Sequence, residues 1–248
     1  MTRGFFLLFG LAAYLIFFAT FLYLVAFVGN LPWVPLTVDR GGPVGGAGLA
    51  AIVDLALVAL FGVQHSVMAR PAFKRWWTRI VPEPIERSVY VLLASVALII
   101  LFLFWRPIPT VIWSVENRAV VIAIYALFAT GWGIVLLSTF LISHFELFGL
   151  TQVWLNLRGR VAADPVFRQP FFYRLVRHPL YTGFFIAFWA TPVMTLGHLV
   201  LASGMSAFML IAIRFEEHDL IDLFGQAYRD YRARTGMLMP RILRRPDA

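Results

Sequence analysis

Residues 180–213 read LYTGFFIAFWATPVMTLGHLVLASGMSAFMLIAI, an almost uninterrupted apolar run. A transmembrane helix needs about 20 apolar residues to cross a hydrocarbon core about 30 Å thick, so this run is too long for one straight span. Pro192 and Gly197 interrupt it near the middle, where proline removes a backbone donor and glycine lets the chain turn. We expect a helical hairpin here, with one long kinked helix as the alternative.

Four more apolar runs precede the hairpin, and none shows the period-2 alternation of a membrane β-strand. They are Phe5–Val28, Leu49–Met68, Val89–Phe104 and Ala119–Ile142. Of the 248 residues 60% are hydrophobic and 14% charged, and the mean hydropathy is +0.80, which leaves too little polar surface for a water-soluble globule. The sequence predicts an all-α, polytopic membrane helix bundle with about five to six transmembrane segments.

The chain shows no internal repeat, so we expect one membrane domain over residues 1–248. Within it, residues 1–142 form a four-helix part, and residues 143–248 form the hairpin and a C-terminal tail. Leu220, Phe224, Tyr228 and Tyr231 form a stripe at helical spacing in that tail. The stripe predicts a cytoplasmic amphipathic helix that covers the site; a plain interfacial helix is the alternative.

Basic residues are concentrated in alternate loops and in the tail. They are Arg70, Lys74, Arg75, Arg79 and Arg87 in one loop, Arg158, Arg160, Arg168, Arg174 and Arg177 in another, and Arg229, Arg232, Arg234, Arg241, Arg244 and Arg245 in the tail. Cytoplasmic loops of membrane proteins carry an excess of Lys and Arg, so these segments and both termini should face the cytoplasm. The net charge of +8 therefore indicates topology and not a nucleic-acid partner.

The chain has no cysteine, which excludes disulfides, thiolate zinc sites and a covalent cysteine nucleophile. Its densest polar clusters flank the hairpin: Arg177-His178-Pro179-Leu180-Tyr181-Thr182-Gly183 before it and Arg214-Phe215-Glu216-Glu217-His218-Asp219-Leu220 after it. If the two arms have similar length, the clusters emerge on the same membrane face. Adjacent carboxylates near a membrane need a compensating partner, which marks this as the expected site. No metal cluster is indicated.

These two clusters, with Phe224-Gly225, Tyr228-x-x-Tyr231 and Met239-Pro240, resemble the C-terminal signature of membrane methyltransferases related to isoprenylcysteine carboxyl methyltransferase. The resemblance implies S-adenosylmethionine as cofactor at the cytoplasmic end of the last helices. The cofactor-binding residues that we expect from it are Arg177, His178, Pro179, Tyr181, Gly183, Arg214, Glu216, Glu217 and Tyr228. Carboxylates suit the ribose hydroxyls or the amino group, and an arginine suits the cofactor carboxylate.

The upstream part resembles a narrower branch. Gln64-His65-Ser66-x-Met68-Ala69-Arg70-Pro71, Pro82-x-x-x-Glu86-Arg87-Ser88-x-Tyr90 and Ser143-His144-Phe145-Glu146-Leu147-Phe148-Gly149-Leu150 are similar to bacterial methanethiol S-methyltransferases. This resemblance implies methyl transfer to a small thiol, methanethiol, giving dimethyl sulfide, in a bacterial inner (cytoplasmic) membrane. The bilayer and the thiol are the expected partners, and no obligate protein partner is indicated.

A thiol must lose its proton to attack well, which calls for a nearby base. His65 and His144 lie near cytoplasmic ends of predicted spans, and we favour His65; a hydrogen-bonded packing histidine is the alternative for each. His198 falls at the far turn. Asp54, in the second apolar run, is a further catalytic candidate because ionisable groups within membranes are often functional.

Two alternatives to a small-thiol acceptor remain open. The first keeps the cofactor and changes the acceptor to an isoprenylcysteine carboxylate or a phospholipid amine. The second is a non-enzymatic membrane protein or an uptake component, in which the polar clusters only anchor the tail.

Overall fold

The computed structural model of the chain describes residues 2–43, 45–161 and 166–241. Five of its helices are long and apolar enough to cross a membrane: α1 (Thr2–Val28), α2 (Ala47–Met68), α4 (Glu83–Phe104), α5 (Arg118–Ile142) and α9 (Leu196–Phe224). Four of these helices contain the first four apolar runs, and α9 contains the second part of the run over residues 180–213, which confirms a polytopic helical bundle. The tail residues Arg244 and Arg245 lie outside the described residues.

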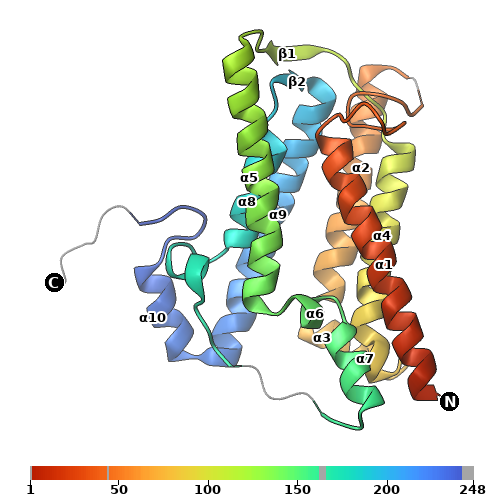
Figure 1. Cartoon of the computed structure of the whole chain (residues 1–248), viewed down its shortest axis with the longest axis vertical. Coiled ribbons are helices and arrows are strands. Elements are labelled where there is room, and N and C mark those ends of the chain that lie inside the picture. Colours follow the sequence, from red (N-terminus) through yellow and green to blue (C-terminus); the bar gives the residue numbers. More distant parts are fainter. Residues whose placement is uncertain (1, 44, 162–165, 242–248) are drawn as a thin grey trace.

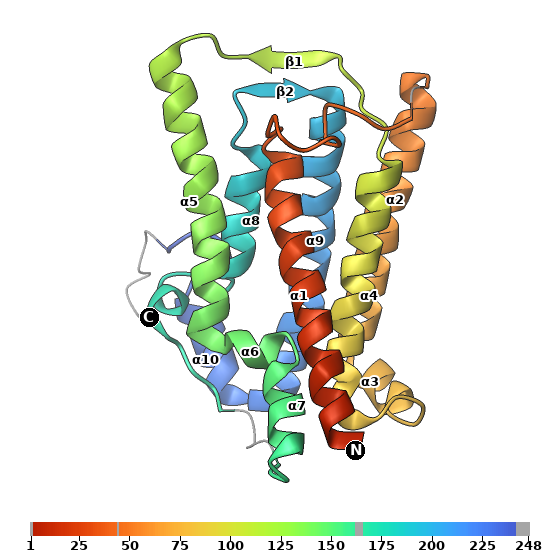
Figure 2. The ribbon, with the colours of Figure 1, turned by 45° about the vertical axis from the view of Figure 1, so that its right-hand side comes forward.

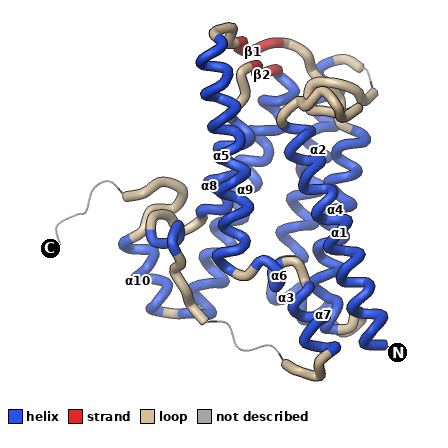
Figure 3. The backbone as a smooth tube through the Cα atoms, viewed as in Figure 1, coloured by secondary structure: helices blue, strands red, loops and turns tan. Residues whose placement is uncertain are grey.

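The remaining helices are short. They are α3 (Pro71–Trp77), α6 (His144–Leu147), α7 (Leu150–Leu157), the 3-10 helix η1 (Phe171–Arg174), α8 (Pro179–Trp189) and α10 (Gln226–Arg234). The described chain is mostly helical, as predicted, and the sequence did not indicate its two short antiparallel strands, β1 (Val111–Ser114) and β2 (Val193–Thr195). Figure 3 shows the two strands together at one end of an otherwise helical molecule. The indole of Trp113 also donates to the Thr191 carbonyl at 3.2 Å, which further ties the α4–α5 connection to the break before α9.

The helices form two groups that meet along α2 and α9 (Figures 1 and 2). One group contains α1, α2 and α4, with α7 packed on α1; in the other, α5 packs along α8, and α8 contacts α9. We call the end with β1 and β2 the strand end, and the opposite end, which holds α3 and α7, the basic end. The N-terminus also lies at the basic end.

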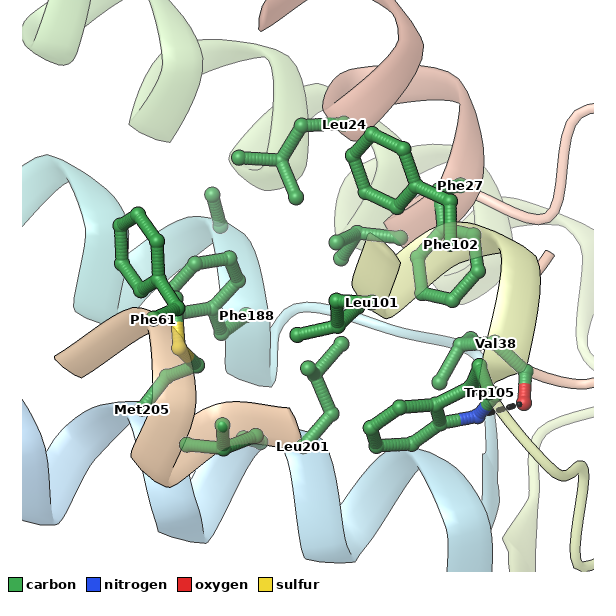
Figure 4. Packing of buried hydrophobic residues seen from close by; sticks show 14 of the residues in the cluster. Leu24, Phe27, Val38, Phe61, Leu101, Phe102, Trp105, Phe188, Leu201 and Met205 are labelled. Carbon is green, nitrogen blue, oxygen red and sulfur yellow. Dashed lines mark hydrogen bonds between the residues drawn. The ribbon is translucent and has the colours of Figure 1, made fainter. Parts of the chain in front are cut away.

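The core joins the two groups near the strand end. Phe27, Leu101 and Trp105 of the first group belong to one buried cluster with Phe188 of α8 and Leu201 of α9, and the Trp105 indole donates to the Val38 carbonyl at 2.9 Å (Figure 4). Trp105 is 1% exposed, so this bond satisfies a polar group that would otherwise be buried without a partner. The strand end is therefore the firmly packed end of the bundle.

Close packing of α5 on α8 depends on glycine. A Cβ at Gly131 would lie 2.8 Å from the Gly183 carbonyl oxygen, and a Cβ at Gly183 would lie 2.6 Å from the Gly131 carbonyl oxygen. Small residues at such positions let helix backbones approach closely in membrane bundles. The two glycines thereby fix the position of α8, whose N-terminal end carries His178.

The arms on either side of the break in residues 180–213 differ in length, since α8 has 11 residues and α9 has 29. The condition of similar arm lengths is therefore not met. The non-helical residues 190–195, which include the strand β2, offset part of this difference, because a strand rises about 3.3 Å per residue and a helix only about 1.5 Å. His178 consequently still comes within hydrogen-bonding distance of α9 at Glu217.

Candidate active site

Two adjoining cavities occupy the part of the bundle nearer the basic end. The helical cavity, about 340 Å³, lies among α1, α2, α4, α5, α8 and α9, and most of its lining is apolar. The vestibule, about 950 Å³, lies between the α2–α3 corner and the last turns of α9. Both are lined by the same five residues, His65, Arg87, Tyr90, Tyr181 and Glu216, which we call the shared wall. A ligand in the vestibule and a ligand in the helical cavity would therefore meet at these side chains.

Three shared-wall residues contact one another. The Tyr90 hydroxyl lies 2.9 Å from Nε2 of His65, and the Arg87 guanidinium lies 4.9 Å from the centre of the Tyr90 ring. Arg87 Nε donates to the Leu147 carbonyl at 2.8 Å, which holds the guanidinium in place over the ring. The wall thus combines an imidazole, a phenol and a cation at the boundary between an apolar and a polar space.

Glu217 is the centre of an ion-paired cluster. Arg177 Nε donates to its Oε1 at 2.7 Å, His178 Nε2 lies 3.1 Å from the same oxygen, and Arg232 Nη1 lies 3.8 Å from Oε2. Arg177 also donates through Nη1 to the carbonyls of Arg232 and Thr235. The cluster therefore joins α8, α9 and α10.

Glu216, the neighbouring residue, has different surroundings. Its Oε2 lies 3.9 Å from His178 Nδ1, and its side chain is 42% exposed against 11% for Glu217. Glu216 lines both cavities, whereas Glu217 lines neither. Glu216 is thus the member of the pair that a ligand can reach.

The vestibule has walls of opposite charge. Arg70, Arg75 and Arg87 line it from the α2, α3 and α4 side, and Glu216, Asp219 and Asp222 line it from α9. Arg70 Nη1 bonds to Asp219 Oδ2 at 2.8 Å across the space. Such a pair of walls suits a zwitterionic ligand, because its cation and its anion each find an opposite charge.

His144 lies at the rim of the helical cavity and is 5% exposed. Thr139 Oγ1 donates to the Leu136 carbonyl, so the hydroxyl accepts from His144 Nδ1, at 2.8 Å. His144 Nε2 then accepts from the Tyr14 hydroxyl, also at 2.8 Å. Burial lowers the pKa of His144, in agreement with a neutral ring that has both nitrogens occupied. The packing alternative for this histidine therefore has direct geometric support.

The structure places three other predicted site residues away from the cavities. Asp54 is fully buried and accepts from the Arg106 amide at 2.9 Å near the strand end, Arg214 is exposed, and Gly183 lies in the α5–α8 contact. None of the three lines either cavity. Pro179 is the first residue of α8, where proline's missing donor costs no helical hydrogen bond. Its place in the fold is thus to start the helix that follows His178.

Tyr228 is 2% exposed and packs against Tyr231 in α10, with ring centres 5.7 Å apart. Burial raises the pKa of Tyr231 to about 12, so its hydroxyl stays protonated and donates to the Tyr173 carbonyl at 2.6 Å. The backbone after α10 continues this contact, since the amides of Arg177 and His178 donate to the carbonyls of Gly236 and Met237. The tail therefore holds the His178 segment against α9.

Sequence reasoning did not assign a role to Arg87, Tyr90, Tyr14 or Thr139. Arg87 and Tyr90 lie within the Pro82-x-x-x-Glu86-Arg87-Ser88-x-Tyr90 pattern, and their spacing of three residues places both on one face of α4. That spacing could have identified Arg87 and Tyr90 as a pair of neighbouring polar side chains. Tyr14 has no comparable signal, because its partner His144 lies 130 residues away.

Curated relatives resemble the chain over nearly its whole length. Methanethiol S-methyltransferase 1 of Bradyrhizobium diazoefficiens is 53% identical over 94% of this chain and 81% of its own length. Methanethiol S-methyltransferase of Mycobacterium tuberculosis is 52% identical over 97% of this chain and 98% of its own. Nurim of Bos taurus is more distant, 28% identical over 88% of this chain and 90% of its own. Neither a protein-family model nor a solved structure matches the chain significantly.

Proposed function

The chain belongs to the methanethiol S-methyltransferase family, and from this membership we infer that it transfers the methyl group of S-adenosylmethionine to methanethiol and so forms dimethyl sulfide. The observation that carries the assignment is about 50% identity to curated methanethiol S-methyltransferases over nearly the full chain. A non-enzymatic role is thereby set aside.

The vestibule fits S-adenosylmethionine in size and in charge. Its volume of about 950 Å³ lies within the range of roughly 300–1,000 Å³ typical of ligand pockets. We propose that Glu216 and Asp219 hold the amino group or ribose hydroxyls and that Arg75 and Arg87 hold the carboxylate. Tyr181 would present an aromatic face to the sulfonium at the shared wall.

When bound, S-adenosylmethionine supplies a methyl group on a positively charged sulfur, and in-line displacement leaves the electron pair on the departing sulfur. The protein has to align the acceptor and remove its proton. His65 is suited to take that proton because its ring lies in the shared wall, next to Tyr90. The same wall borders the polar vestibule, through which the proton can leave to water. We therefore propose His65 as the general base, and His144 and Asp54 are not carried into this mechanism.

Glu217 supports the site indirectly in this proposal. Its bonds to Arg177 and His178 hold the start of α8, and Tyr181 is the third residue of that helix. We propose that Arg177, His178 and Tyr228 likewise act by positioning Tyr181 and Glu216. Their contacts with α9 and α10 support this view.

We further propose that α8, the non-helical residues 190–195 and α9 form one hairpin, so that the chain crosses the membrane six times. The alternating distribution of basic residues supports a cytoplasmic basic end, with both termini and the vestibule on that side. α10 would then lie at the cytoplasmic surface of a bacterial inner membrane. Residues 1–248 form a single domain in this arrangement.

The test is a headspace assay for dimethyl sulfide with purified protein, S-adenosylmethionine and methanethiol. His65→Ala should lower kcat by about 100- to 10,000-fold, the usual contribution of a positioned base.

Glu216→Gln should raise the Kd for S-adenosylmethionine by about 10- to 150-fold, because it removes charge-assisted hydrogen bonds. Glu116→Gln is the matched control, since Glu116 is exposed at the strand end.

The three parts of this proposal, namely the reaction, the base and the cofactor site, can be refuted separately. Wild-type protein that binds S-adenosylmethionine and forms no dimethyl sulfide would refute the reaction. Near-normal turnover by His65→Ala would refute the base. An unchanged Kd for Glu216→Gln, measured by isothermal titration, would refute the vestibule as the cofactor site.

A further inference from the structure

The helical cavity is much larger than methanethiol. A cavity holds a water molecule from about 10–15 Å³ upward, and pockets for drug-sized ligands begin near about 300 Å³. Methanethiol has only two heavy atoms, whereas this cavity has a volume of about 340 Å³. Most of the space is therefore not needed for the smallest acceptor.

The cavity is divided by polarity along its length. Its polar end consists of the shared wall with Tyr173, Arg177 and His178. Its other end, the apolar end, is lined mostly by apolar side chains, among them Phe61, Phe188, Met205 and Met209, together with Thr20 and Ser95, whose hydroxyls donate to carbonyls of their own helices. No residue of this second set carries a charge. The adenosine and amino-acid groups of the cofactor do not suit this end, because burying polar groups without partners costs several kcal/mol.

The apolar end is built from firmly packed residues. Figure 4 shows Phe61, Phe188 and Met205 gathered from α2, α8 and α9. All three are buried, and Phe188 is almost completely so. Methionine is an adaptable lining for ligands of varied shape, because its side chain is unbranched and polarizable. The space is thus a preformed apolar pocket that opens onto His65.

The cavity also reaches the side of the bundle. Phe18 of α1 and Leu136 and Ile142 of α5 line it, and each of them is also exposed on the molecular surface. In a membrane this surface faces acyl chains. A lipophilic molecule dissolved in the bilayer therefore lies next to the cavity.

We propose that the chain also methylates longer lipophilic thiols, of the class of n-propanethiol to n-hexanethiol, with the alkyl chain in the apolar end of the helical cavity. This inference rests on the proposed function and extends its acceptor range. The chemistry is unchanged: the S–H bond breaks, its proton passes to His65, and the acceptor sulfur forms one new S–C bond. The methyl–sulfonium bond of the donor breaks, and the products are an alkyl methyl sulfide and S-adenosylhomocysteine.

Ala94 is the position that should set the accepted length. It lies on α4, is 9% exposed, and lines the apolar end one helical turn beyond Tyr90. A larger side chain at this position would fill space that the alkyl chain needs. Leu93, on the same helix, is 37% exposed, does not line the cavity and provides the control position.

The experiment measures kcat/KM of the full-length protein for methanethiol, n-butanethiol and n-hexanethiol, with product sulfides quantified by gas chromatography. Each buried methylene should lower KM by about three- to fourfold until the cavity is full. Ala94→Leu should lower the ratio of n-butanethiol to methanethiol kcat/KM at least tenfold. Leu93→Phe should leave that ratio, and activity, unchanged.

A second measurement needs no variant. Di-n-butyl sulfide, which has no proton to lose, should inhibit wild-type methanethiol methylation competitively with the thiol and not with S-adenosylmethionine. Methanethiol turnover without n-butanethiol turnover and without this inhibition would overturn the longer-thiol proposal alone. Absence of turnover with every thiol would instead overturn the proposed function on which it rests.

Discussion

At the scale of single residues, Glu216 and Glu217 show how neighbours in the sequence acquire different surroundings. Successive residues on a helix point about 100° apart. Glu217 therefore faces Arg177 and His178 in the interior, while Glu216 faces the two cavities. A buried carboxylate that is ion-paired with Arg177 and in contact with His178 is held for structure. A half-exposed carboxylate at a cavity wall is free to bind a ligand.

His144 gives a prediction about pH at the same scale. Its pKa is lowered in the folded protein, while in the unfolded chain it takes the ordinary histidine value of about 6.5. Below that pH the unfolded state binds a proton that the folded state resists, so stability is present at higher pH and is lost as pH falls. We expect the Tm of the wild type to fall between pH 7.5 and 5.5, and we expect His144→Gln to show a smaller fall.

The measurement is thermal unfolding in detergent micelles across that pH range. His218→Gln is the control, because the side chain of His218 is 75% exposed. An identical pH dependence in wild type and His144→Gln would contradict the assignment of a neutral, hydrogen-bonded His144.

At the scale of elements, the contact between α5 and α8 is the one on which the site most depends. α8 begins directly after His178 and carries Tyr181. Because α8 is only 11 residues long, its position is set by packing against α5 and by the tail segment Gly236–Met237. Gly183, which the sequence suggested as a cofactor-binding residue, lies in this contact and lines neither cavity.

Gly131→Ala tests that contact. The added Cβ would lie 2.8 Å from both the Ala187 amide nitrogen and the Gly183 carbonyl oxygen, and overpacking of this kind typically costs about 1–3 kcal/mol. We expect a lower Tm together with weaker S-adenosylmethionine binding, since α8 would shift. Unfolding scans and isothermal titration measure the two effects.

Gly133→Ala is the matched control on the same helix. Nothing lies within 4 Å of a Cβ at Gly133, so the substitution should be neutral or stabilise by up to about 1 kcal/mol through helix propensity. Equal effects of the two substitutions would contradict the packing role of Gly131.

At the scale of the whole molecule, the two ends of the bundle differ in what holds them together. The strand end has a small sheet and a packed aromatic core, while the basic end has two cavities and an ion-paired cluster. Ligand sites require such space and polarity, and a packed opposite end supplies the rigidity to position them. The division fits a donor that arrives from water and an acceptor that dissolves in lipid.

The absence of cysteine allows a direct test of orientation. Glu116→Cys at the strand end and Arg79→Cys at the basic end would each introduce a single exposed thiol. A membrane-impermeant maleimide should label Glu116→Cys in intact cells and Arg79→Cys only after permeabilisation. The reverse labelling pattern would contradict a cytoplasmic vestibule.

The sequence by itself determined that this protein is a membrane-spanning helical bundle. The length of an apolar run is set by the thickness of the hydrocarbon core and can be counted without knowing any tertiary contact. The sequence also marked the polar segments from which we propose that the site is built, including His65, His178, Tyr181 and Glu216, because polar residues beside a long apolar run stand out. The same segments contain the motifs by which the sequence resembles its family.

Only the tertiary structure decided which of these residues face a common space. His65 meets Tyr90, Tyr181 and Glu216 across four helices, while Asp54 is held by Arg106 near the far end and Gly183 is taken up in helix packing. The tautomer of His144 depends on Tyr14 and Thr139, two residues on different helices. The physical reason is that a site is a set of long-range contacts, and the direction in which each side chain points is fixed by how the helices pack, which local sequence does not specify.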